Sequence, residues 1–132
     1  MQDIKIRSQC IEEACCGGVD FPGEILKDLC YLQLRDICEA IAITCLIIHQ
    51  DESDIKKLSS IWSAPEIMAA LEKMNPNYFP VAITLNRTNN NRIQVNIADP
   101  QPVSKHELLK IYGRCGDQVH RGCLKKLPKR FM

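Results

Sequence analysis

The residues best suited to chemistry lie close together near the C-terminal end of the chain. Arg114, Asp117 and His120 bring a guanidinium, a carboxylate and an imidazole into one short segment. Asp117 is three positions from each of the other two, a spacing that makes neighbours on a helix surface. Arg114 and His120 are about 240° apart around a helix, but Gly113 and Gly116 loosen it.

This set of side chains suits phosphodiester chemistry. An imidazole with a pKa near neutral can move a proton to or from a ribose hydroxyl. A guanidinium can hold the negative charge of a phosphorane through two hydrogen bonds. Arg114 and His120 could therefore act on RNA without a metal ion, and Asp117 could orient the imidazole or pair with the guanidinium.

Two other interpretations of the same segment stay open. Arg114 and Asp117 could form an ordinary ion pair while His120 lies at the helix C-terminus, where the helix dipole favours a cation. Alternatively, Cys115, His120 and Cys123 could hold zinc, although no fourth ligand follows at the usual spacing.

Positive charge gathers at the same end of the chain. Residues 1–104 hold 9 Lys and Arg against 14 Asp and Glu, whereas residues 105–132 hold 8 against 2. Such an excess can meet the phosphates of a nucleic acid or the acidic face of a partner, or it can serve only as a solvated tail. The residues expected to contact nucleic acid are Arg121, Lys125, Lys126, Lys129 and Arg130.

The cluster lies on a predicted helix that begins at a capping box. The Ser104 hydroxyl can accept from the Glu107 amide while the Glu107 carboxylate reaches back. The longest helix is predicted over residues 24–49, at about 39 Å. It carries two apolar stripes, so we expect neighbours on two sides, and a second subunit is one candidate. The first stripe consists of Leu26, Cys30, Leu34, Ile37, Ile41, Cys45 and Ile48.

Shorter elements complete the expected fold. A helix should start near Asp51 or Ser53, and another should run from about residue 64 to 74 behind a Ser63–Glu66 capping box. Period-2 alternation predicts a β-hairpin over about residues 80–98, whose apolar face must lie on the helices or whose edge must pair with a second copy. Residues 1–19 are expected to form a flexible loop or a short frayed helix. The sequence thus predicts a single mainly α domain over residues 1–132, a bundle of about four helices with one inserted hairpin.

Composition excludes several classes of protein. The chain has 132 residues, of which 45% are hydrophobic and 25% charged, so it suits one soluble globular domain. It shows neither a signal-peptide stretch nor the roughly 20 apolar residues of a membrane span, which favours a cytoplasmic location with its eight cysteines reduced. No phosphate-binding glycine loop, serine elbow or HExxH motif occurs, which argues against NTPases, α/β-hydrolases and zinc peptidases.

Two features of the sequence, taken together, resemble those of a known protein family. The first is a long amphipathic helix followed by further helices, and this long helix bears Arg35, Asp36 and Glu39. The second is a late helix that carries Arg114 and, six positions later, His120. In these features the chain resembles the HEPN superfamily over roughly residues 24–74 and 104–122.

Members of that superfamily are helical domains that often dimerise and act as metal-independent endoribonucleases in toxin and phage-defence systems. The resemblance implies that Arg114 and His120 form the active pair, with Glu39 or Asp36 as a supporting acid. It also implies RNA as substrate, a homodimer whose long helices face each other, a cognate antitoxin as partner and no cofactor. The hairpin would be an insertion into the family's helical bundle.

A second hypothesis is a non-catalytic helical module for dimerisation or protein interaction. It keeps a dimer face but gives Arg114 and His120 purely structural roles. Substitution of His120 by alanine separates the two hypotheses, because in the module it should alter stability alone.

Overall fold

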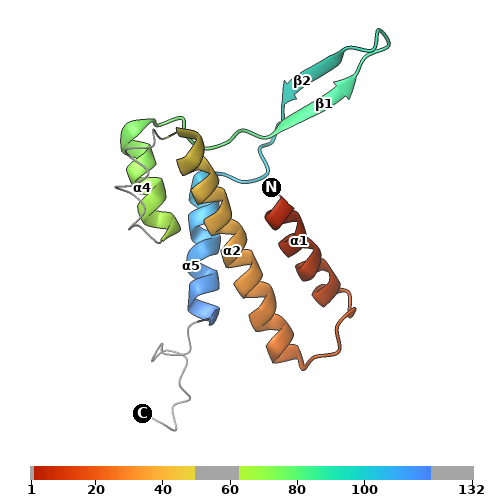
Figure 1. The fold of residues 1–132 in the computed structure, drawn as a ribbon, viewed down its shortest axis with the longest axis vertical. Helices are drawn as coiled ribbons and strands as arrows, with labels where there is room; N and C mark the ends of the chain where they lie inside the picture. Colours follow the sequence, from red (N-terminus) through yellow and green to blue (C-terminus); the bar gives the residue numbers. More distant parts are fainter. Residues whose placement is uncertain (1, 50–62, 120–132) are drawn as a thin grey trace.

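The computed structural model describes residues 2–49 and 63–119, which form a mainly helical fold with one hairpin (Figure 1). The elements are α1 (Gln2–Cys15), α2 (Gly23–His49), α4 (Ala64–Met74), β1 (Ile83–Arg87), β2 (Ile93–Ile97) and α5 (Lys105–Val119). The predicted helical bundle with an inserted hairpin is confirmed. The helix predicted near Asp51 lies outside the described residues. None of the described helices is both long and apolar enough to cross a membrane.

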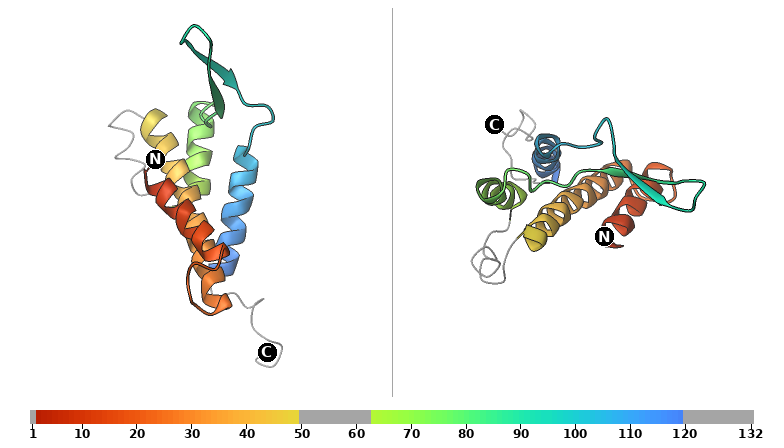
Figure 2. Two further views of the ribbon diagram at one scale, coloured as in Figure 1. Left: turned by 90° about the vertical axis from the view of Figure 1, so that its right-hand side faces the viewer. Right: turned by 90° about the horizontal axis from the view of Figure 1, so that it is seen from above.

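Helix α2 lies at the centre and has neighbours on two sides. In Figures 1 and 2, α1 and α5 run antiparallel to α2 along different faces of it, and α4 lies beside α5 at the C-terminal end of α2. The two sides predicted for the long helix are therefore occupied by helices of the same chain. Part of its apolar surface stays exposed, at Leu32, Ile43 and Ile47.

Helix α1 corrects the prediction of a loop or a short frayed helix over residues 1–19. The segment forms a helix of 14 residues that packs on α2. Its Arg7 Nη1 donates to Asp36 Oδ2 at 2.7 Å and to Gln33 Oε1 at 2.8 Å, both on α2. The glycine pair ends this helix, since Gly17 has a φ of 77°. Because tertiary contacts stabilise α1, its local sequence pattern gave little sign of it.

Both predicted capping boxes place their serine at a helix start. The Glu66 amide donates to Ser63 Oγ at 3.4 Å, and the Glu107 amide donates to Ser104 Oγ at 3.2 Å. The Ser104 amide in turn donates to Glu107 Oε2 at 2.7 Å, and this bond lowers the pKa of the Glu107 carboxyl. The start of α5, the helix that carries Arg114, is thereby fixed.

The core lies where α2, α4 and α5 meet. Leu71 of α4 is fully buried there, and Tyr78 of the connector after α4 joins it. The other buried members are Cys38, Ala42, Cys45, Leu46, Ala64, Ile67, Met68, Leu108 and Tyr112. The core thus holds α5 against the middle and C-terminal part of α2.

The hairpin projects away from the helices (Figures 1 and 2). Its strands are antiparallel and pair Ile83 with Ile97 and Leu85 with Val95, and all ten strand residues are exposed. Of the two alternatives expected for the hairpin, packing of its apolar face on the helices is not seen, and pairing of its edge with a second copy stays a prediction. At the base of the hairpin the Gln101 amide bonds to the backbone of Ala82 and Ala98 at 2.6–3.2 Å and so ties the two connectors together.

Substitution of Leu71 by alanine should destabilise the fold strongly. The side chain is 0% exposed, so its truncation leaves a cavity at the junction of three helices and should lower the free energy of unfolding by about 2–5 kcal/mol. Urea denaturation followed by circular dichroism measures this. Ile6→Ala is the control, because Ile6 is exposed on α1 and its truncation should cost about 0.5 kcal/mol or less. Equal losses in both variants would contradict the described core.

Candidate functional site

Arg114 and Asp117 lie on the exposed side of α5, beside an open hollow between α5 and α2. The hollow has a volume of about 430 Å³. It is lined by Tyr31, Leu34, Ile111, Arg114, Cys115, Asp117 and Gln118. The structure thus brings a cation, a carboxylate, an amide and a phenol together around one space, which is open to solvent.

The Arg114 guanidinium makes no ion pair or hydrogen bond with any other residue in the described part of the chain. In particular, the alternative in which Arg114 pairs with Asp117 across one turn is not seen, although both side chains are exposed on the same helix. An exposed pair of this kind gains little free energy from forming, because water screens both charges. The guanidinium is therefore available to an anion from solution.

His120 and the five basic residues predicted to contact nucleic acid lie outside the described residues. The last described residue of α5 is Val119, directly before His120. The structure therefore places Arg114 and Asp117 of the predicted site, and the position of His120 relative to them stays a prediction from the sequence.

Glu39, the predicted supporting acid, belongs to a different cluster. Arg35 donates from Nε to Glu39 Oε1 at 3.3 Å and from Nη2 to the Tyr112 hydroxyl at 3.0 Å. The Tyr112 hydroxyl donates to the same Glu39 oxygen at 3.0 Å. The Arg35 guanidinium also lies over the Tyr112 ring, 4.9 Å from its centroid. Glu39 thus joins α2 to α5 and does not line the hollow.

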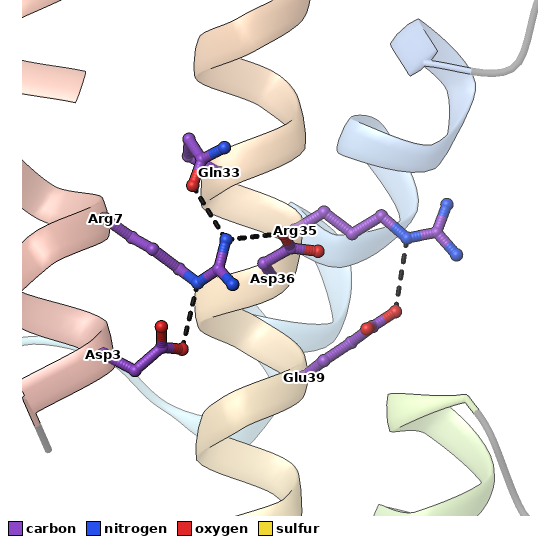
Figure 3. A network of polar contacts seen from close by, with 6 residues as sticks. All are labelled: Asp3, Arg7, Gln33, Arg35, Asp36 and Glu39. Atoms are coloured by element: carbon purple, nitrogen blue, oxygen red, sulfur yellow. Dashed lines mark hydrogen bonds and ion pairs between the residues drawn. The ribbon is translucent and has the colours of Figure 1, made fainter. Parts of the chain in front are cut away.

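Asp36, the other candidate acid, is a neighbour of Glu39 on the surface of α2 but faces a different helix. Its carboxylate accepts from Arg7 of α1, whereas Glu39 accepts from Arg35 on the side of α5, as Figure 3 shows. Arg7 is held further by Asp3 of its own helix at 3.0 Å. The two carboxylates that the sequence offered as alternatives therefore each join α2 to a different neighbouring helix.

Arg35 and Tyr112 are the residues that the sequence interpretation missed. They are 77 positions apart, so no local spacing connects them. The sequence offered one sign of this pair, because Arg35 is a charged residue within a long apolar helix. Such a residue needs a partner from another element. Burial raises the pKa of the Tyr112 hydroxyl, and its hydrogen bond to Glu39 raises it further, so it remains a neutral donor near neutral pH.

Cys115, directly after Arg114, points into the core and is only 1% exposed. Burial raises the pKa of its thiol, and burial raises that of the neighbouring Cys38 to about 11. Both thiols are therefore neutral near pH 7 and act as small apolar groups. In the zinc alternative, His120 and Cys123 lie outside the described residues, and the described ranges contain no group of three or more metal-ligating side chains.

Comparison with known proteins gave no match: no family model fits the chain, and neither a curated protein nor a solved structure is similar to it.

Stability should fall at alkaline pH. Burial raises the pKa values of Cys38, Cys115 and Tyr112 in the folded chain above the ordinary values of 9.0 and 10.0. The unfolded chain then loses these protons at lower pH than the folded chain does. The three protonated groups contribute fully to the free energy of unfolding below about pH 9. This contribution is lost as the pH rises through the pKa values that the groups have in the folded chain. Urea unfolding at a series of pH values from neutral to alkaline measures the slope of the free energy of unfolding against pH.

Cys38→Ala should make this slope shallower, because it removes the thiol whose pKa is raised to about 11. Cys16→Ala should leave the slope unchanged, because Cys16 is exposed. An equal slope in Cys38→Ala and the parent protein would contradict the burial of this thiol.

Proposed function

We propose that this chain is a HEPN-like RNA-binding domain that cleaves single-stranded RNA without a metal ion. One observation carries the proposal: Arg114 lines an open hollow, is exposed, and has no hydrogen-bonding or ionic partner in the described structure. A guanidinium in that state matches the bidentate geometry of a phosphate group. The resemblance in the sequence supplies the rest, because it places His120 six residues later.

In this proposal the imidazole of His120 accepts the proton of a ribose 2′-hydroxyl. The 2′-oxygen attacks the adjacent phosphorus, the bond to the 5′-oxygen breaks, and that oxygen takes up a proton from water, while the proton on His120 is later released to solvent. Arg114 holds the non-bridging oxygens while the phosphorane charge develops. The products are a 2′,3′-cyclic phosphate and a 5′-hydroxyl, and Asp117 would orient the imidazole from one turn away.

The surroundings of Arg114 fit a single strand. Tyr31 lines the same hollow from α2, and an aromatic ring offers a face on which an unpaired base can stack. Arg121, Lys125, Lys126, Lys129 and Arg130 would follow the RNA backbone through their charges. Glu39 takes a different part from the one the resemblance suggested. As a positioning residue it would hold α5 against α2 through Tyr112.

In this proposal the chain is a cytoplasmic toxin or phage-defence protein, and a cognate antitoxin inhibits it. A nuclease of this kind must be restrained in its own cell. An acidic antitoxin segment could cover Arg114 and the basic residues after it, because both would otherwise attract RNA.

Cleavage should depend on Arg114 and His120. The test incubates the purified chain with a mixed pool of single-stranded RNA in EDTA and analyses the ends of the products. His120→Ala should lower the cleavage rate by about 10²–10⁴ and leave binding intact, because it removes proton transfer. Arg114→Ala should lower the rate by about 10²–10³, because it removes charge stabilisation.

Arg92→Ala is the matched control. Arg92 is an exposed arginine of the hairpin loop, so the same charge is removed away from the hollow and the rate should not change. A chain that neither cuts the pool in EDTA nor retards it at low salt would overturn the proposal. Equal effects of Arg114→Ala and Arg92→Ala would reduce the role of Arg114 to its net charge.

A second candidate function is that of a protein-interaction module, and the exposed hairpin favours it. Its strands carry five large apolar side chains that are all more than half exposed. In such a module Arg114→Ala and His120→Ala would affect stability alone. The RNA assay described above therefore separates the two functions.

A further inference from the structure

The two faces of the hairpin have opposite character. The register places Ile83 opposite Ile97, Leu85 opposite Val95, and Arg87 opposite Ile93, so these six side chains share one face. The other face carries only polar side chains, those of Thr84, Asn86, Gln94 and Asn96. We call the first set the hairpin face. Its five apolar members are Ile83, Leu85, Ile93, Val95 and Ile97, which are 54%, 64%, 66%, 57% and 72% exposed.

Such a surface is unfavourable in water when it is left uncovered. An isolated two-stranded hairpin is marginal, and it usually needs an apolar surface to pack on. Here the Gln101 side chain bonds to Ala82 and Ala98 and closes the base of the hairpin, and the ribbon projects away from the helices (Figure 1). The hairpin face is thus exposed to solvent on an ordered ribbon.

A groove continues this apolar surface at the base of the hairpin. It has a volume of about 320 Å³ and lies between the connectors of the hairpin, α2 and α5. The side chains that form its floor include Leu34, Ile37, Ile41, Leu108 and Ile111. Val81 lines this base groove and also begins the alternation that leads to Ile83 and Leu85, so the groove and the hairpin face form one continuous surface.

We propose that a second copy of this chain covers the hairpin face. The two hairpins would stack face to face about a two-fold axis near Leu85 and Val95. The tip of each hairpin would then lie over the base groove of the other copy. A two-fold contact uses the same patch on both copies, so the patch must be self-complementary, and the five apolar side chains of the hairpin face meet this requirement.

The apolar area that the hairpin faces and base grooves can bury is compatible with the size of a specific interface. Burial of a Val, Leu or Ile side chain removes roughly 60–120 Å² from water, so the five half-exposed side chains supply about 300 Å² in each copy. Two hairpin faces alone give about half of the 1,200 Å² that a small specific interface buries. The two base grooves must supply the remainder. The proposal therefore requires the tip of each hairpin to reach the groove of its partner.

Charge favours the antiparallel stacking of the two ribbons. Arg87 lies at the tip of the hairpin face, opposite Ile93, and Asp99 follows Ala98 at the base. Both side chains are exposed. When the tip of one hairpin lies over the base of the other, Arg87 approaches Asp99 of the second copy. A parallel stack would instead place the two Arg87 side chains together, which is unfavourable.

Sedimentation of the full-length chain tests the proposal. The parent protein, in a reductant that prevents disulfides among its eight cysteines, should be a dimer at tens of micromolar. The double variant Leu85→Thr with Val95→Thr should raise the dissociation constant by about 100-fold or more, because each copy loses two apolar side chains at the centre of the contact. Threonine favours strands and pairs well across them, so the hairpin itself should persist.

The matched control changes the polar face. Asn86→Thr with Gln94→Thr alters another directly opposed pair in the same strands and should leave the dissociation constant unchanged. Hydrogen exchange at the hairpin amides supplies a second readout, because protection should rise with concentration in the parent and in the control but not in the double variant. Far-ultraviolet circular dichroism should show equal helix content in all three proteins, since the substituted side chains are exposed on the strands and lie outside the helical core.

Three results would overturn the proposal. The parent protein could be monomeric at tens of micromolar, whether or not its hairpin then binds lipid vesicles or another protein. The double variant could stay dimeric, which would place the contact elsewhere, for example on α2. Finally, the control could lose the dimer as fully as the double variant does, which would attribute the effect to general damage to the hairpin.

Discussion

What α5 presents to solvent depends on how it is held against α2. Apolar packing supplies most of this contact, and the Arg35, Tyr112 and Glu39 side chains add a polar connection within it. The phenol bonds to both the arginine and the carboxylate, and the charges of the arginine and the carboxylate compensate each other in a half-buried position. Because Tyr112 is held in this way, Arg114, two residues later, lies on the exposed side of the helix.

The two exposed surfaces of functional interest lie at opposite ends of α5. The hairpin leaves the bundle near the start of this helix, whereas Arg114 and Asp117 lie near its end (Figure 1). A dimer formed through the hairpins would therefore leave Arg114 and Asp117 of each copy outside the contact between the hairpin faces. This differs from the arrangement implied by the HEPN resemblance, in which the long helices face each other and two half-sites form one cleft.

Much of the fold was predictable because local signals decide it. The apolar period of α2, the serine caps at Ser63 and Ser104 and the alternation in the hairpin each depend on neighbours within a few residues. Helix α1 was missed because Arg7 joins it to Gln33 and Asp36 of α2, which lie 26 and 29 positions further along the chain. The direction of the hairpin was missed because the alternation within its strands carries no information on where the ribbon lies relative to the helices.

The candidate site was predictable only in part. Residue types and spacing were enough to select Arg114 and Asp117, and the structure places both beside one hollow. The partner of Glu39 could not be found in this way, because a carboxylate on α2 can face either α1 or α5. Asp36 and Glu39 are three residues apart and face different helices, so a small rotation of α2 decides which acid is nearer to α5.

In the proposed function Arg114 offers its guanidinium to a phosphodiester, whereas Arg35 is bonded to Glu39 and Tyr112 within the protein. Nuclear magnetic resonance of the arginine Nε–H groups tests this most directly, with a short single-stranded RNA added stepwise to His120→Ala protein so that no cleavage occurs. Arg114→Lys assigns the decisive signal. The account predicts a saturable shift of the Arg114 signal and little change at Arg35, whose Nε already donates to Glu39. An unmoved Arg114 signal, or an equal shift at the hairpin residues Arg87 and Arg92, would contradict it.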